Sequence, residues 1–92
     1  MAPYDTVEEY TEKSDGYVEH VRIRKTDDDK YPCGYDYILH YGTTDGETLL
    51  RYDNAHERSK GHECHTGDGV TEIEFPGMME LYQRFRGEIE DL

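Results

Sequence analysis

"YDYILHYGTTDGETLLRYD", residues 35–53, is the stretch that decides the fold. Large aromatic and aliphatic residues recur at every second position from Tyr35 to Tyr41, which is typical of a β-strand with one buried face. "TDGE" at 44–47 predicts a hairpin connection, because Asp-Gly is the favoured pair of the primed turns. "TLLRYD" then continues as the antiparallel partner. Arg51 and Asp53 fall on one face of this strand, and Tyr52 falls on the other.

The sequence before this hairpin predicts a turn, a strand and a loop, and leaves the first thirteen residues open. "SDG" at 14–16 predicts a turn, and "YVEHVRIRK" at 17–25 reads as a half-buried strand. "TDDDKYPCG" at 26–34 predicts a loop, since adjacent aspartates repel one another and Pro32 cannot donate to a strand ladder. Residues 1–13 are acidic and weakly patterned, and they fit either a short strand or a helical turn.

The segments after the hairpin complete an α+β prediction. "VTEIEF" at 70–75 reads as a last short strand. "PGMMELYQRFRGEIEDL" at 76–92 reads as an amphipathic helix. Its apolar positions are Met78, Leu81, Tyr82, Phe85, Ile89 and Leu92. We predict a single domain over 1–92, with a poorly patterned N-terminal segment at 1–13, an antiparallel sheet of hairpins at 14–75, and the helix at 76–92 packed on one face.

The composition is strongly acidic. There are 22 acidic residues against 10 basic ones, a formal net charge of −12, and only four of the basic residues are lysine. This balance opposes contact with polyanions at low salt and fits the cytosol of a salt-loving organism, where concentrated salt screens self-repulsion. The start of the chain carries no secretion signal, and no apolar run could span a membrane. We expect a cytoplasmic protein in which Cys33 and Cys64 are reduced.

Residues 51–65 differ from the rest of the chain in charge. They hold three acidic and three basic residues together with His56, His62 and His65, so the field opposes an anion such as RNA least here. Arg51 and Asp53 form either a surface ion pair or a guanidinium held by a carboxylate so that it meets a phosphate bidentately. Arg58 and Lys60 are loop cations that either improve solubility or hold the phosphate backbone.

The histidines of "GHECH" at 61–65 have three interpretations. His56, His62, Cys64 and His65 could form a mixed nitrogen and sulfur set of zinc ligands. If the segment is extended, Glu63 and His65 share a face, and the carboxylate can orient the imidazole for proton transfer. The third interpretation is that these are solvated loop side chains. His20 and His40, each alone in a predicted strand, are assigned to that last class.

"RYDN" at 51–54, the histidine segment that ends in "HTGD", the short strand and the closing helix resemble the TumE-type toxin family of toxin–antitoxin systems. The resemblance implies a small ribonuclease that a separately encoded antitoxin neutralises. Residues 51–54 match the first motif of the family, and His65 matches the second. The family commonly has a second histidine where this chain has Glu63, and His62 is offset from that position.

The leading hypothesis is a metal-independent endoribonuclease in which a base activates the RNA 2′-hydroxyl and an acid protonates the leaving 5′-oxygen. Expected partners are RNA and a cognate antitoxin, and a second copy of the chain is a further candidate partner; no membrane and no cofactor are expected. The rival hypotheses are a non-enzymatic interaction module of the same fold and a small zinc protein. The candidate catalytic residues are Arg51, Asp53, His62, Glu63 and His65, and the candidate substrate-binding residues are Tyr52, Asn54, His56, Arg58 and Lys60.

Overall fold

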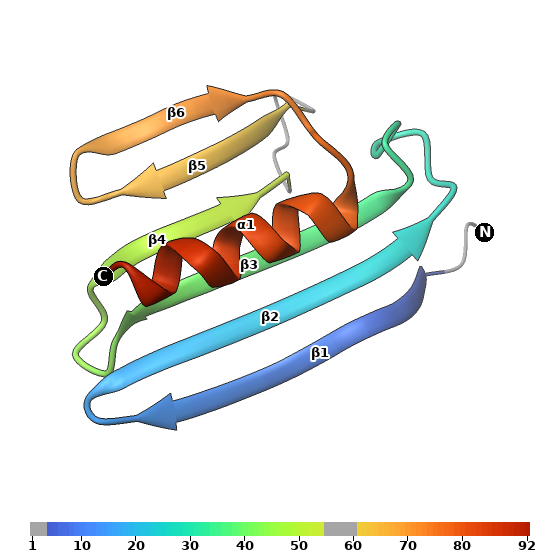
Figure 1. The fold of residues 1–92 in the computed structure, drawn as a ribbon. Helices are drawn as coiled ribbons and strands as arrows, with labels where there is room; N and C mark the ends of the chain where they lie inside the picture. The colour runs from blue at the N-terminus through green and yellow to red at the C-terminus, as the bar shows by residue number, and fades with distance from the viewer. Residues whose placement is uncertain (1–3, 55–60) are drawn as a thin grey trace.

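The protein is a six-stranded antiparallel sheet with one helix on one of its faces, in a computed structural model that describes residues 4–54 and 61–92 (Figure 1). The strands neighbour one another in chain order, and the helix follows the last strand. The elements are β1 Tyr4–Ser14, β2 Tyr17–Thr26, β3 Tyr35–Thr43, β4 Thr48–Asp53, β5 His62–Thr66, β6 Gly69–Ile73 and α1 Met78–Glu90. The predicted α+β class, an antiparallel sheet with a C-terminal helix packed on one face, is confirmed.

The N-terminal strand corrects the prediction for residues 1–13. β1 is eleven residues long and pairs with β2 along its whole length, so the sheet begins at Tyr4 rather than near residue 14. Only Tyr10 of β1 is partly buried, because β1 is an edge strand that lies to one side of the helix (Figure 1). A strand with almost no buried face has no hydrophobic alternation, and its sequence therefore carried no periodic signal.

The two predicted turns are both present, and one differs in type. Asp15 and Gly16 both have positive φ, 55° and 86°, which closes the β1–β2 hairpin in two residues. In the β3–β4 connection only Gly46 has positive φ (97°), and the backbone N–H of Thr43 donates to the carbonyl of Glu47 at 2.8 Å. The second turn is therefore a four-residue connection with a register shift after Tyr41, and not the two-residue primed turn.

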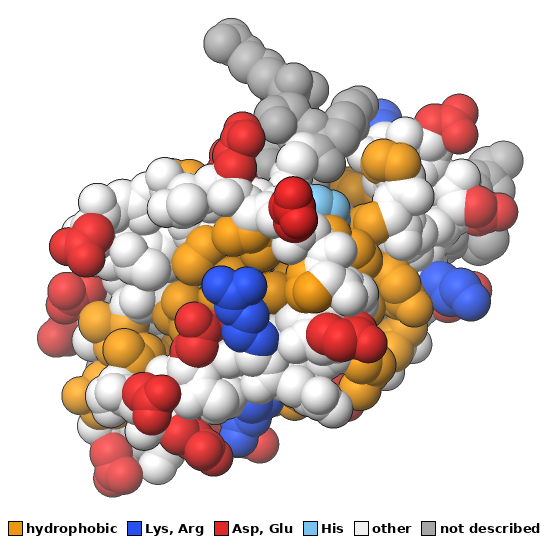
Figure 2. Space-filling view, turned by 45° about the horizontal axis from the view of Figure 1, so that its top comes forward, with side chains coloured by type: hydrophobic (Ala, Val, Ile, Leu, Met, Phe, Trp, Pro, Cys, Tyr) orange, Lys and Arg blue, Asp and Glu red, His pale blue; other side chains and the backbone are white. Residues whose placement is uncertain are grey.

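The helix and one face of the sheet enclose the core. We call this side of the sheet the helix face. Hydrophobic side chains gather around the helix here, with acidic groups interspersed among them (Figure 2). In the described part of the chain, the buried hydrophobic residues are Val21, Ile23, Tyr37, Leu39, Leu50, Tyr52, Met78, Leu81 and Phe85. Burial of this apolar surface is the main favourable term in folding.

Polar contacts at the rim of the core fix the helix on the sheet. Arg86 pairs with Glu19 of β2, and the hydroxyls of Tyr10 and Tyr82 lie 2.9 Å apart. The helix begins at Met78, two residues later than predicted. Leu92 lies beyond its end and is 67% exposed, so the predicted apolar stripe stops at Ile89.

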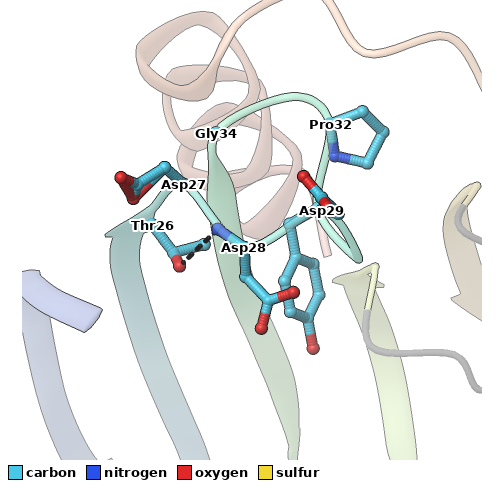
Figure 3. Close-up of a pocket in the computed structure, with 7 residues that line it drawn as sticks. Thr26, Asp27, Asp28, Asp29, Pro32 and Gly34 are labelled. Atoms are coloured by element: carbon cyan, nitrogen blue, oxygen red, sulfur yellow. Dashed lines mark hydrogen bonds between the residues drawn. The ribbon is translucent and has the colours of Figure 1, made fainter. Parts of the chain in front are cut away.

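The loop predicted at 26–34 connects β2 to β3 (Figure 3). The N–H of Thr26 donates to the carbonyl of Gly34 at 2.9 Å, and the N–H of Asp28 donates to the Thr26 hydroxyl at 3.1 Å. Three consecutive aspartates line a cavity at this end of the sheet (Figure 3). The cavity has the wrong sign of charge for a nucleic acid, and it lies outside the segment singled out by the sequence.

Candidate functional site

The strand register brings four of the predicted residues together on the face of the sheet opposite the helix. Arg51 of β4 lies directly opposite His65 of β5, and Asp53 lies opposite Glu63. Because side chains alternate along a strand, all four project to the same side. This confirms the two predicted pairings, Arg51 with Asp53 and Glu63 with His65, and adds that the pairs meet.

We call this side of the sheet the polar face. Two cross-strand rows run across it, one residue from each strand. The first row is Thr11, His20, His40, Arg51, His65 and Val70, and the second is Glu9, Arg22, Ile38, Asp53, Glu63 and Glu72. No helix or strand among residues 4–54 and 61–92 packs over these rows.

Asp53 is the centre of the cluster. Its Oδ2 atom accepts a hydrogen bond from Arg51 Nε at 2.7 Å and lies 3.5 Å from His65 Nε2. The same His65 nitrogen lies 3.3 Å from Glu63 Oε1. The Asp53 side chain is 3% exposed, whereas that of Arg51 is 40% exposed. A buried carboxylate therefore holds a guanidinium at the surface, which is the arrangement that presents an arginine to an oxyanion.

Three of the predicted residues have contacts that point to structural roles. Tyr52 is fully buried under the helix, and its hydroxyl donates to Glu88. Asn54 is also buried; its amide oxygen accepts from the N–H of Tyr37 at 3.1 Å and its amide nitrogen donates to the carbonyl of Tyr35 at 2.7 Å. Neither residue offers a surface to a substrate. We therefore correct their assignment from substrate binding to the support of the strand that carries Arg51.

His62 is the third of these residues, and it lies on the helix face. Its ring stacks on Phe75, with the centroids 4.5 Å apart, and its Nδ1 lies 2.8 Å from the Tyr37 hydroxyl. Burial lowers the pKa of His62. Because the sheet separates this imidazole from Arg51 and His65, we correct its predicted catalytic role. His56, Arg58 and Lys60 lie outside the described residues.

The possible metal ligands also divide between the faces. His62 and Cys64 project to the helix face and His65 to the polar face, so these three members of the predicted zinc set do not converge. On the polar face, ligand atoms of Asp53, Glu63 and His65 all lie within 4.8 Å of one another. A cation held there would compete with the Arg51 guanidinium for the Asp53 carboxylate.

The predicted site did not include His40, which was assigned to the solvated side chains. This residue lies on β3 directly opposite Arg51, on the side of β4 away from His65. Along the strand, His40 alternates with Tyr37 and Leu39, so the sequence indicates that its side chain lies on the face away from the core. That it faces Arg51 depends on the pairing of β3 with β4, which parity within one strand does not define.

The fold and site define a small α+β protein whose sheet carries an arginine, two flanking histidines and two carboxylates on the face opposite its only described helix. The family model of the toxin TumE matches residues 2–92, and the chain belongs to that family. Membership supports a toxin of a toxin–antitoxin system with a cognate antitoxin as its partner. No curated protein and no solved structure is significantly similar to the chain. The one described helix is too short and too polar to cross a membrane.

Proposed function

We propose that this toxin is a metal-independent endoribonuclease whose active site is the Arg51, Asp53, Glu63 and His65 cluster on the polar face. The 2′-oxygen of RNA attacks the adjacent phosphorus, and the bond from phosphorus to the 5′-oxygen breaks. The products are a 2′,3′-cyclic phosphate and a free 5′-hydroxyl. The protein then has to position the phosphate, stabilise its added negative charge and move one proton from the 2′-oxygen to the 5′-oxygen.

The contact between Arg51 and the buried Asp53 is the observation that carries this proposal. Asp53 holds Arg51 Nε at 2.7 Å, so the guanidinium is oriented before a substrate arrives. An oriented donor stabilises charge in the transition state without the cost of reorganisation. His65 Nε2 lies 3.5 Å from the same carboxylate oxygen, so its imidazole would lie beside a phosphate held by Arg51 and could transfer a proton to it.

The polar face carries arginines beside its carboxylates. Arg22 and Arg24 of β2 lie on the same face as Arg51, and so do the carboxylates of Glu9, Asp36, Asp53, Glu63 and Glu72. Among the described residues, Arg24 pairs with Asp36 and Arg51 pairs with Asp53. RNA binding by a chain with a net charge of −12 therefore depends on the local contact of a phosphate with Arg51 and on salt that screens the surrounding carboxylates.

The partner and the setting are part of the same proposal. A surface with an excess of carboxylates attracts a basic protein, so we infer a basic antitoxin as the neutralising partner. We place the protein in the cytoplasm of a salt-loving cell, where RNA is available and salt screens the repulsion between RNA and the acidic surface. A second copy of the chain as a partner is an expectation that size-exclusion chromatography with light scattering can test.

The test is cleavage of RNA by the purified protein in molar KCl. We expect fragments with 2′,3′-cyclic phosphate ends, at a rate that a metal chelator does not change. Replacing one electrostatic donor or one proton-transfer group typically lowers kcat by about 10²–10³-fold or more, so Arg51→Ala and His65→Ala should each be strongly impaired.

The matched control is Arg84→Ala, which removes an arginine of similar exposure from the helix face (50% against 40% for the Arg51 side chain). This variant should cleave RNA like the parent. Cleavage that persists in the double variant Arg51→Ala, His65→Ala would reject the site. Loss of cleavage on addition of chelator would instead support a metal ion at Asp53, Glu63 and His65.

A further inference from the structure

In-line displacement at phosphorus sets a geometric requirement that the four-residue cluster alone does not meet. The attacking and leaving oxygens lie roughly in line through phosphorus, so the base and the acid approach from opposite sides. Glu63 lies 3.3 Å from His65, on the same side of Arg51 as that histidine. His62 lies on the other face of the sheet. Neither Glu63 nor His62 can therefore act as the second proton-transfer group on the side of Arg51 away from His65.

We propose, as an extension of the proposed ribonuclease function, that His40 is the general base of this site and acts across Arg51 from His65. His40 lies opposite Arg51 on β3, and His65 lies opposite Arg51 on β5. Neighbouring strands are about 4.8 Å apart, so these two backbones are separated by roughly 10 Å. That width accommodates one phosphate over Arg51 with an imidazole on each side.

The surroundings of His40 suit a neutral imidazole. Its ring lies beside Gly42, and a Cβ added at that glycine would stand 3.1 Å from His40 Nε2. The absence of a side chain at Gly42 therefore makes room for the imidazole. The charged or titratable groups that face it are Arg51 of β4 and His20 of β2. Burial lowers the pKa of His40, and both of these neighbours lower it further. A base has to be unprotonated at the working pH, and burial, Arg51 and His20 all favour the unprotonated form of His40.

The proton transfers balance in this arrangement. His40 takes the proton of the 2′-hydroxyl as the bond from the 2′-oxygen to phosphorus forms. His65 gives a proton to the 5′-oxygen as the bond from phosphorus to that oxygen breaks. The carboxylates of Asp53 and Glu63 lie 3.5 and 3.3 Å from His65 Nε2, so the ring is held at the edge of the cluster for this transfer. Arg51 remains charged throughout and holds the phosphate.

The experiment separates the two roles with a modified leaving group. The cleavage site is first mapped on an RNA oligonucleotide, and the same oligonucleotide is then prepared with sulfur in place of the leaving 5′-oxygen. A thiolate leaves without general acid assistance, whereas attack by the 2′-hydroxyl still requires the base. The variants are His40→Gln, His40→Asn and His65→Gln, with His20→Gln as the control one strand further along the row. Urea unfolding first establishes that each variant is folded.

We expect His40→Gln and His40→Asn to lower kcat by about 10²–10⁴-fold on both oligonucleotides. His65→Gln should lower it on the oxygen oligonucleotide and largely recover on the sulfur one. His20→Gln should cleave both like the parent. Cleavage by the parent together with near-parental rates in the folded His40 variants would overturn this inference and leave the proposed function intact. Absence of cleavage by the parent protein itself would overturn both.

Discussion

Asp53 shows how one residue can organise the site. Its carboxylate is buried and contacts both Arg51 and His65, which come from neighbouring strands. Removing the partner of a buried charge destabilises a protein, so the Asp53 position couples stability to the orientation of the proposed catalytic groups. Asn54, the next residue, fixes the start of β3 through the backbone of Tyr35 and Tyr37.

His62 gives a residue-scale prediction for stability against pH. Because burial lowers its pKa below 6.5, the unfolded chain takes up the proton first as the pH falls. The contribution of His62 to stability is therefore present above about pH 6.5 and is lost as the pH falls towards the folded-state pKa. The variant His62→Gln, which does not titrate, should lose less stability than the parent between pH 7.5 and pH 5.

Urea unfolding at a series of pH values measures this difference. Tyr37→Phe is the matched variant, since it removes the hydroxyl 2.8 Å from His62 Nδ1 but keeps the stacked, buried environment. Burial is the cause of the lowered pKa, so this variant should keep the parental pH dependence. Equal pH dependence in the parent and in His62→Gln would show that His62 does not contribute to it.

At the scale of the elements, the segments with local periodicity were predictable. β2, β3, β4 and α1 each bury one face, and the alternation or helical spacing of their apolar residues shows it. β1 could not be predicted in the same way, because its backbone pairs with β2 while its side chains remain almost entirely exposed. Backbone hydrogen bonds pair β1 with β2 along its length, and this pairing leaves no mark on a hydropathy pattern.

Two glycines test the packing of β3 and α1 in opposite directions. A Cβ at Gly42 would stand 2.3 Å from the backbone oxygen of Glu47, whereas one at Gly87 would meet nothing within 4 Å. We expect Gly42→Ala to lower the free energy of unfolding by about 1–3 kcal/mol through overpacking. Gly87→Ala, inside the helix, should raise it by up to about 1 kcal/mol. Both values come from urea unfolding, and a neutral Gly42→Ala would show that the hairpin can shift.

At the scale of the whole molecule, charge governs stability. A net charge of −12 on 92 residues disfavours the compact state through self-repulsion. Added salt shortens the Debye length from about 10 Å at 0.1 M to about 3 Å at 1 M and so removes most of this repulsion. We expect the melting temperature to rise steadily with KCl over this range.

A variant with fewer charges provides the control. Glu8→Gln with Glu12→Gln removes two exposed carboxylates from the edge strand and changes the net charge from −12 to −10. Its melting temperature should start higher at low salt and rise less with KCl. A melting temperature that does not depend on KCl in the parent would contradict the role assigned to self-repulsion and the inference of a salt-loving source.

The sequence by itself determined the α+β class, the central hairpin, the closing helix and the shared face of Arg51 with Asp53 and of Glu63 with His65. Each of these follows from interactions between residues close in the chain, through strand alternation or helical periodicity. Only the tertiary structure decided that the two pairs meet at Asp53, that His62 is part of the core and that His40 faces Arg51. The physical reason is that strand register is fixed by long-range pairing and by the packing of the helix on one face, and neither is encoded in a single segment.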